Sequence, residues 1–147
     1  MDATARRDEL RKFFEELITA FGRKDFDTFA RFVHPEALFE WPYLPLKQFP
    51  TEMRGRDVFI ETSRAGMANS DGYNHKIDAF YDQVDPDMLI VEYHSDSAVK
   101  PSGERYANKY LGILRFSGDQ VVFWKEYVNP LPILEVYGEF VNDAAQL

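Results

Sequence analysis

The sequence predicts an α+β fold, in which a curved antiparallel or mixed sheet wraps as a cone around three helices from the N-terminal half. Apolar residues recur at helical spacing up to about residue 67, whereas β-branched and aromatic runs dominate from residue 73 onward. The strands expected there are too long for a small flat sheet, so the sheet must twist or curl. Such a sheet can enclose an interior pocket.

Composition limits the class of protein. The 147 residues are 45% hydrophobic and 16% aromatic, which fits a single domain over residues 1–147, with a flexible tail expected at 139–147. A formal charge of -8 argues against nucleic-acid and anionic-membrane partners. The absence of cysteine excludes thiolate chemistry and cysteine-ligated zinc. With no leader-like segment and no long apolar run, a soluble cytoplasmic protein is expected.

Three helices are expected before the sheet. The first covers residues 4–21, with Thr4 as a cap and Gly22 as a stop. The second follows a cap at Asp25 and stops at Pro35, and the third covers residues 57–67. The apolar side chains that the second helix should bury are Phe26, Phe29, Phe32 and Val33.

A strand at residues 37–41 and an irregular segment at 42–54 separate the second helix from the third. The irregular segment combines three prolines with apolar and aromatic side chains. That combination suits a flap over a cavity, and a packed surface loop is the alternative.

Four strands are expected at residues 73–84, 88–99, 105–116 and 121–129. Their boundaries are turn signals at Asp85-Pro86-Asp87, at Lys100-Pro101-Ser102-Gly103 and at Ser117-Gly118-Asp119. A helical turn at 133–137 should follow, after Pro130 and Pro132 end the last strand.

Glu126 is the most informative residue in the chain. Strand alternation puts it in one row with Val122, Trp124 and Val128, a row that is otherwise apolar. Burial raises the pKa of a carboxyl group toward the range useful for proton transfer. A carboxylate satisfied structurally by a neighbouring Tyr, Lys or amide is the alternative.

The neighbouring strand supplies an aromatic wall for a small-molecule pocket. The side chains that should share its face, beside the Glu126 row, are Tyr106, Asn108, Tyr110, Gly112 and Leu114. An ordinary aromatic core, in which the tyrosine hydroxyls reach the surface, is the alternative.

The three histidines are weaker candidates. Glu92, His94 and Asp96 alternate along one strand and could present ligands to a metal, but a polar outer sheet face or a dimer contact is the favoured interpretation. His34 and His75 sit at element ends, where capping or surface roles are common. Dinucleotide, P-loop, zinc-protease and nucleophile-elbow motifs are all missing.

The order of elements resembles the cone-shaped nuclear-transport-factor-two-like superfamily, which includes SnoaL-like cyclases, ketosteroid isomerases and limonene epoxide hydrolase. A local resemblance to the phenazine PhzA/PhzB group rests on four short motifs. They are Gly55-Arg56-Asp57, Asp85-Pro86-Asp87, Tyr106-Ala107-Asn108-Lys109-Tyr110-Leu111 and Lys125-Glu126-Tyr127-Val128-Asn129.

The resemblance implies that Glu126 is the acid/base group, since a pocket glutamate of the phenazine group occupies the matching place. The chain also departs from its relatives. The phenazine pocket histidine falls near Thr62, and the steroid isomerase base and acidic donor fall near Trp41 and Gly112. The arginine and second aspartate of the epoxide hydrolase fall near Tyr93 and Ser95.

We therefore expect a cofactor-independent and metal-free acid/base enzyme that isomerises, cyclises, condenses or hydrates an apolar or aromatic small molecule. Glu126 would move the proton, Tyr93 or Tyr110 would donate to a developing oxyanion, and Asn108 would orient the substrate. The wall and lid would be formed by Trp41, Tyr43 and Trp124.

Two alternatives come from other classes. One is a noncatalytic binding protein that uses the same pocket. The other is a structural module that forms a homodimer through the open sheet face, which would carry His94, Lys109 and Tyr127.

Overall fold

The computed structural model describes residues 1–47, 49–99 and 103–145, and within them it contains four helices and one six-stranded sheet. The helices are α1 (Ala3–Gly22), α2 (Phe26–Arg31), α3 (Arg56–Gly66) and α4 (Pro130–Ala145). The strands are β1 (Val33–Glu40), β2 (Glu52–Arg54), β3 (Lys76–Asp82), β4 (Met88–Val99), β5 (Glu104–Ser117) and β6 (Gln120–Val128).

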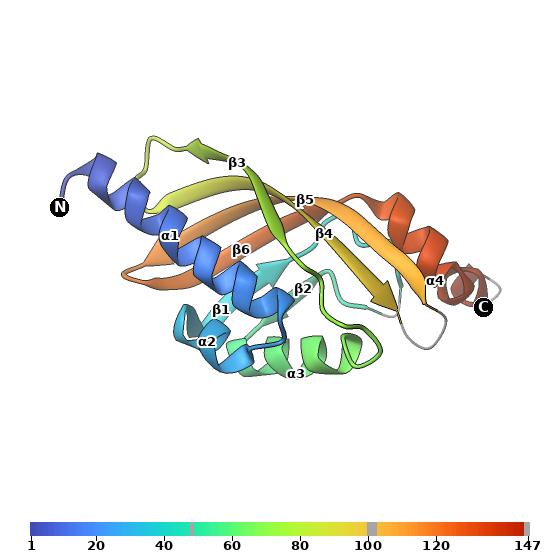
Figure 1. Ribbon diagram of the computed structural model, residues 1–147. Coiled ribbons are helices and arrows are strands. Elements are labelled where there is room, and N and C mark those ends of the chain that lie inside the picture. Colours follow the sequence, from blue (N-terminus) through green and yellow to red (C-terminus); the bar gives the residue numbers. More distant parts are fainter. Residues whose placement is uncertain (48, 100–102, 146–147) are drawn as a thin grey trace.

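The sheet is mixed and strongly curved, as the sequence predicts. Its strand order is β2-β1-β6-β5-β4-β3, with β1 parallel to β6 and all other neighbours antiparallel. Helix α1 crosses the curved sheet, α2 and α3 lie beside β1, and α4 lies at the end away from the N-terminus (Figure 1). The predicted α+β cone is confirmed.

Aromatic side chains from the first helix and the inner sheet face form the core. Phe14 of α1 is fully buried, and its ring centroid lies 5.3 Å from that of Tyr93 and 5.8 Å from that of Trp124. The predicted inner face of β5 and β6 is confirmed, because Tyr110 pairs with Val128 and Leu114 with Trp124. This packing joins the helix to the wall that carries Glu126.

The helix boundaries differ from the prediction at two points. The side chain of Asp2, not Thr4, caps α1 by accepting the Ala5 N–H at 2.8 Å. The predicted cap Asp25 does begin α2, but α2 ends at Arg31, and the segment from Val33 to Pro35 is already strand. Val33 is β-branched and pairs with Val121 of β6, so sheet pairing outweighs its helical spacing.

Three further differences concern the second half of the sheet and its surroundings. The irregular segment at 42–54 contains the short strand β2, which pairs with β1. A register shift near Arg115 places Val121, not Val122, on the fully buried face. Helix α4 is longer than the predicted turn and runs to Ala145, so the flexibility of the tail at 139–147 stays a prediction. Most of the turn expected at 100–103 lies outside the described residues.

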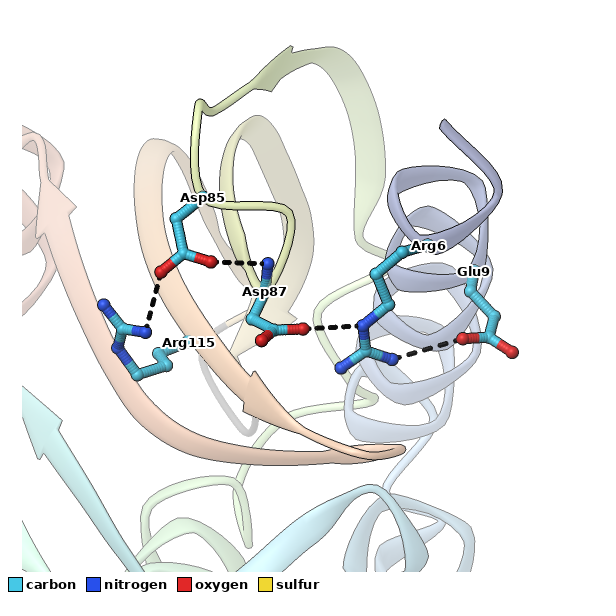
Figure 2. A network of polar contacts seen from close by, with 5 residues as sticks. All are labelled: Arg6, Glu9, Asp85, Asp87 and Arg115. Carbon is cyan, nitrogen blue, oxygen red and sulfur yellow. Dashed lines mark hydrogen bonds and ion pairs between the residues drawn. The ribbon is translucent and has the colours of Figure 1, made fainter. Parts of the chain in front are cut away.

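The Asp85-Pro86-Asp87 motif is a structural joint between the β3–β4 turn, α1 and β5 (Figure 2). The Asp85 carboxylate accepts hydrogen bonds from the Asp87 N–H and the Arg115 guanidinium, both at 3.0 Å. The Asp87 carboxylate accepts from Arg6 of α1 at 2.8 Å. This motif therefore connects α1 to the sheet. It is a structural contact and does not involve Glu126 on β6.

Gly72 makes a close backbone approach to the end of α1. It has a φ of 111°, and the Tyr73 N–H donates to the Gly22 carbonyl oxygen at 3.0 Å. A Cβ atom at residue 72 would collide with that carbonyl oxygen. The contact holds the segment that leads into β3 against the first helix.

We expect Gly72→Ala to lower the free energy of unfolding by about 2 to 4 kcal/mol, through positive-φ strain and overpacking. Gly66→Ala is the matched control, because a Cβ there meets nothing within 4 Å. It should be neutral or slightly stabilising. Urea unfolding of both variants checks this, and equal stability of the two would contradict the contact.

Candidate active site

The cone contains an open-mouthed cavity of about 380 Å³, within the size range of small-molecule pockets. The flap, α3, α4 and the inner sheet face bound it, so the predicted flap over a cavity is confirmed. Its lining contains no Lys or Arg, and Glu126 is its sole carboxylate among the described residues. The lining side chains from the flap are Leu44, Leu46, Phe49, Pro50 and Met53. Those from the helices include Phe59, Thr62, Ser63, Ile133 and Tyr137.

Glu126 lies on β6, with its carboxyl group at the cavity wall. The Tyr93 hydroxyl of β4 donates a hydrogen bond to Glu126 Oε2. Trp41, which follows β1, lines the same cavity and helps to lower the pKa of the carboxyl group. The Tyr93 hydrogen bond therefore orients the carboxyl group from a strand two positions away in the sheet.

Gly112 of β5 makes the Tyr93 hydrogen bond possible. It pairs with Val91 on one side and Glu126 on the other, so it lies between the strands that carry donor and acceptor. A Cβ atom there would lie 3.2 Å from Tyr93 Cε1 and 3.3 Å from Trp124 Nε1. Tyr93 thus reaches over the one residue of the central strand that has no side chain.

The surroundings of Glu126 tune its charge. Burial raises the pKa of Glu126 from 4.5 to about 7, and the Tyr93 hydrogen bond and Trp41 limit that rise. Burial, together with the nearby Glu126, raises the pKa of Tyr93 well above 10, so its hydroxyl keeps its proton and remains a donor. A carboxyl group that titrates near neutrality can both accept and return a proton.

A chain of hydroxyl groups runs beside the cavity. The Tyr110 hydroxyl lies 2.7 Å from Ser95 Oγ and 3.5 Å from the Tyr106 hydroxyl. Asn108 Nδ2 donates to the Tyr106 hydroxyl at 2.8 Å and to the Asn129 carbonyl at 3.0 Å. The amide of Asn108 is therefore occupied in holding Tyr106 and Asn129.

His75 enters the cavity from the segment before β3. Its ring packs against four aromatic rings, with centroid separations of 5.7 Å to Tyr73, 5.8 Å to Phe21 and to Tyr110, and 5.9 Å to Tyr93. Burial lowers the pKa of His75 from 6.5 to about 3. The imidazole is therefore neutral at physiological pH.

The structure brings four of the seven predicted site residues to the cavity lining: Trp41, Tyr110, Trp124 and Glu126. Tyr93 and Asn108 are buried behind the wall and contact the site through Glu126 and Tyr106. Tyr43 lies outside the lining, 61% exposed, with its ring 5.1 Å from that of Tyr127. The substrate-binding roles given to Tyr43 and Asn108 stay predictions.

Sequence reasoning missed His75 and Tyr73 as cavity residues. The sequence predicted a strand from residue 73 and a capping or surface role for His75, whereas β3 begins at Lys76 and both residues precede it. The Gly72 turn folds this segment against α1 and turns both rings inward. The paired glycines Gly22 and Gly72 are the signal that could have indicated this close packing.

Glu92, His94 and Asp96 lie on the outer face of the sheet, which is polar. This agrees with the interpretation favoured from the sequence. His94 Nδ1 lies 2.8 Å from the Asp78 carboxylate, Asp96 pairs with Arg105, and Glu92 accepts from Tyr81. In the described part of the chain, no three His, Cys, Asp or Glu side chains are placed to hold a metal ion. No described helix has the length and apolar character needed to span a membrane.

The chain matches a known sequence family and two curated proteins. A family model described as the SnoaL-like domain matches residues 7–124. An uncharacterised PhzA/B-like protein of Pseudomonas aeruginosa is 31% identical over 105 residues, which cover 71% of this chain and 73% of that protein. The uncharacterised protein YesE of Bacillus subtilis is 23% identical over 131 residues, covering 89% and 86%.

Three solved structures share the fold. A Bacillus subtilis protein named as an isomerase candidate has a TM-score of 0.81 at 20% identity, covering 94% of this chain and 96% of its own. A phenazine biosynthesis-related protein of Pseudomonas aeruginosa has a TM-score of 0.74 at 17% identity, covering 91% and 88%. An epoxide hydrolase of Mycobacterium tuberculosis, similar to the limonene enzyme, has a TM-score of 0.69 at 17% identity, covering 87% and 88%.

Because the pKa of Glu126 is raised, the free energy of unfolding should decrease as the pH increases. The unfolded chain loses this proton near pH 4.5 and the folded chain keeps it to about 7, so the free energy of unfolding decreases across that window. Glu126→Gln removes the charge. It should stabilise the protein at about pH 9 by roughly 2 to 3 kcal/mol more than at about pH 5.

Urea unfolding at both pH values measures this difference. Glu92→Gln on the exposed face is the control and should show no comparable gain at high pH. A Glu126→Gln protein whose relative stability is the same at both pH values would contradict the raised pKa.

Proposed function

The chain belongs to the SnoaL-like domain family, and from this premise we propose that it is a cofactor-independent acid/base enzyme. Its substrate is an uncharged, largely apolar or aromatic small molecule. The observation that carries the proposal is Glu126, an oriented carboxyl group with a pKa of about 7 in an otherwise apolar cavity.

The cavity favours a neutral substrate. A carboxylate or phosphate ligand would lose its hydration on entry and would find no Lys or Arg among the described lining residues. It would also lie near Glu126 when that group is ionised. Stacking against Trp41 and Trp124 instead suits an apolar or aromatic body.

A single carboxyl group suits proton transfer within one substrate better than water addition. It can remove a proton from one carbon and return it to another, which is an isomerisation or the start of a cyclisation. Hydration of an epoxide needs groups for both the water and the leaving oxygen, and no arginine or second carboxylate is among the described lining residues. Of the names given to the structural relatives, isomerase therefore fits this site better than epoxide hydrolase.

The neighbouring residues have separate roles in this proposal. Tyr93 is a positioning residue, because its hydroxyl is committed to Glu126 and does not reach the cavity lining. Tyr110 lines the cavity with its ring, while its hydroxyl is hydrogen-bonded to Ser95. The apolar flap side chains Leu44, Leu46 and Phe49 give the site a low-dielectric surrounding, in which electrostatic interactions are stronger.

A noncatalytic binding protein is the second candidate, and the size of the cavity favours it as much as it favours an enzyme. A purely structural module has less support, because the cone is not filled by its own Tyr and Trp side chains. The two remaining functions differ only in whether the bound compound is converted.

We expect Glu126→Gln to abolish conversion while leaving binding intact, with a loss in turnover of at least about 100-fold. The test incubates small-molecule extracts with the protein in deuterated water and follows them by mass spectrometry. Isomerisation appears there as deuterium incorporation at an exchanging carbon. The wild-type kcat/KM should rise with pH through about 7, as the Glu126 base ionises.

Glu92→Gln serves again as the control and should match the wild-type rate. Unchanged conversion by Glu126→Gln would refute the enzyme proposed here. A compound that both proteins retain and neither converts would support the binding protein instead.

A further inference from the structure

His75 is a partly buried polar side chain in the cavity lining, and it makes no hydrogen bond to Glu126 or its partners. Nδ1 is enclosed and has no hydrogen-bond partner among the described residues. It packs against the end of α1, where a Cβ atom on Gly22 would lie 3.0 Å from it. A ring nitrogen enclosed without a partner costs free energy, and burying the ring there calls for a compensating interaction.

The other ring nitrogen is the one available to a ligand. The ring lines the cavity, Nδ1 is sealed against α1, and Nε2 makes no hydrogen bond with the described protein. An enclosed N–H without an acceptor is less tolerated than an enclosed lone pair. The neutral ring therefore carries its proton on Nε2 and offers one N–H donor to the cavity.

His75 and Glu126 are linked through Tyr93. The Tyr93 ring makes an edge contact with the His75 ring at 5.9 Å, while its hydroxyl donates to Glu126. The Tyr93 side chain therefore contacts both His75 and Glu126.

We propose that His75 is a hydrogen-bond donor to the substrate in this site, where its Nε2–H holds the carbonyl oxygen of an uncharged ketone. This inference rests on the proposed function and names its substrate class. The Glu126 carboxylate takes a proton from the carbon beside the carbonyl group. The C–H electron pair moves into the C–C–O unit, and the enolate oxygen formed there accepts the hydrogen bond from Nε2.

The proton balance closes without a co-reactant. The imidazole keeps its proton throughout. In a β,γ-unsaturated ketone, the protonated Glu126 returns the transferred proton to the γ-carbon while the C=C bond shifts beside the carbonyl group, and the enolate oxygen becomes a carbonyl oxygen again. A neutral imidazole suits this role, since its N–H interacts most strongly with the oxygen once charge has developed on it. The fixed cation that a carboxylate substrate would need does not occur among the described lining residues.

Three matched probes test the proposal: 2-acetylnaphthalene, its oxygen-free isostere 2-isopropenylnaphthalene, and the anion 2-naphthoate. Binding is followed by tryptophan fluorescence, because Trp41 and Trp124 both line the cavity. The wild type should bind the ketone about threefold to tenfold more tightly than the isostere, as one hydrogen bond contributes. 2-Naphthoate should bind more weakly than the ketone.

His75→Phe keeps an aromatic ring in the cluster and removes the donor, so it should bind ketone and isostere equally. Tyr81→Phe removes a hydroxyl from the outer sheet face, away from the cavity lining, and should keep the preference. A preference that survives in His75→Phe, or a wild type that binds the ketone no tighter than the isostere, overturns the proposal. Tighter binding of 2-naphthoate overturns the uncharged substrate class.

A second measurement does not depend on any ligand or on the folding of a variant. Nitrogen chemical shifts of histidine-labelled wild type should show His75 with its proton on Nε2, and a proton on Nδ1 would overturn the proposal. The ketone preference should also persist in Glu126→Gln. The ketone preference therefore tests the role of His75, and the loss of conversion in Glu126→Gln tests the role of Glu126. Either role can fail while the other stands.

Discussion

The hydrogen bond from Tyr93 to Glu126 is the interaction on which the site depends. It joins β4 to β6 across β5, and it forms because Gly112 leaves the space over the central strand empty. The bond fixes the direction of the carboxyl group and offsets part of the cost of its burial. Curvature of the sheet, the stack of Tyr93 on Tyr110 at 5.1 Å and the contact with Phe14 all hold the donor in place.

Few polar groups line the cavity. This explains both why ionised Glu126 destabilises the fold and why the group can act as a base. The Tyr110 hydroxyl and the Asn108 amide are hydrogen-bonded within the protein, whereas His75 Nδ1 and Trp124 Nε1 have no partner among the described residues. An ionised Glu126 destabilises the fold at high pH, where the same charge makes the group a base. Desolvation of an ionisable group is typical of functional sites.

The fold and the central residue could be predicted from the sequence, but the far wall of the cavity could not. Strand alternation correctly placed Glu126 and Trp124 beside Tyr110, because period-two patterning survives in a paired sheet. Alternation failed at Val122, where a bulge shifts the pattern by one residue. His75 escaped prediction because its position depends on a backbone contact between Gly22 and Gly72, which local patterning does not encode. Tyr93 was predicted to face a substrate, and only the geometry over Gly112 shows that its hydroxyl serves Glu126.

Direct titration of the Glu126 carboxyl carbon by NMR, in wild type and in Tyr93→Phe, tests the central claim most directly. Glu126→Gln assigns the resonance by its disappearance. We expect a pKa of about 7 in wild type and a higher value in Tyr93→Phe, because the lost hydrogen bond stabilises the ionised form. A wild-type carboxyl group that titrates at its ordinary value near 4.5, unchanged by Tyr93→Phe, would contradict this expectation.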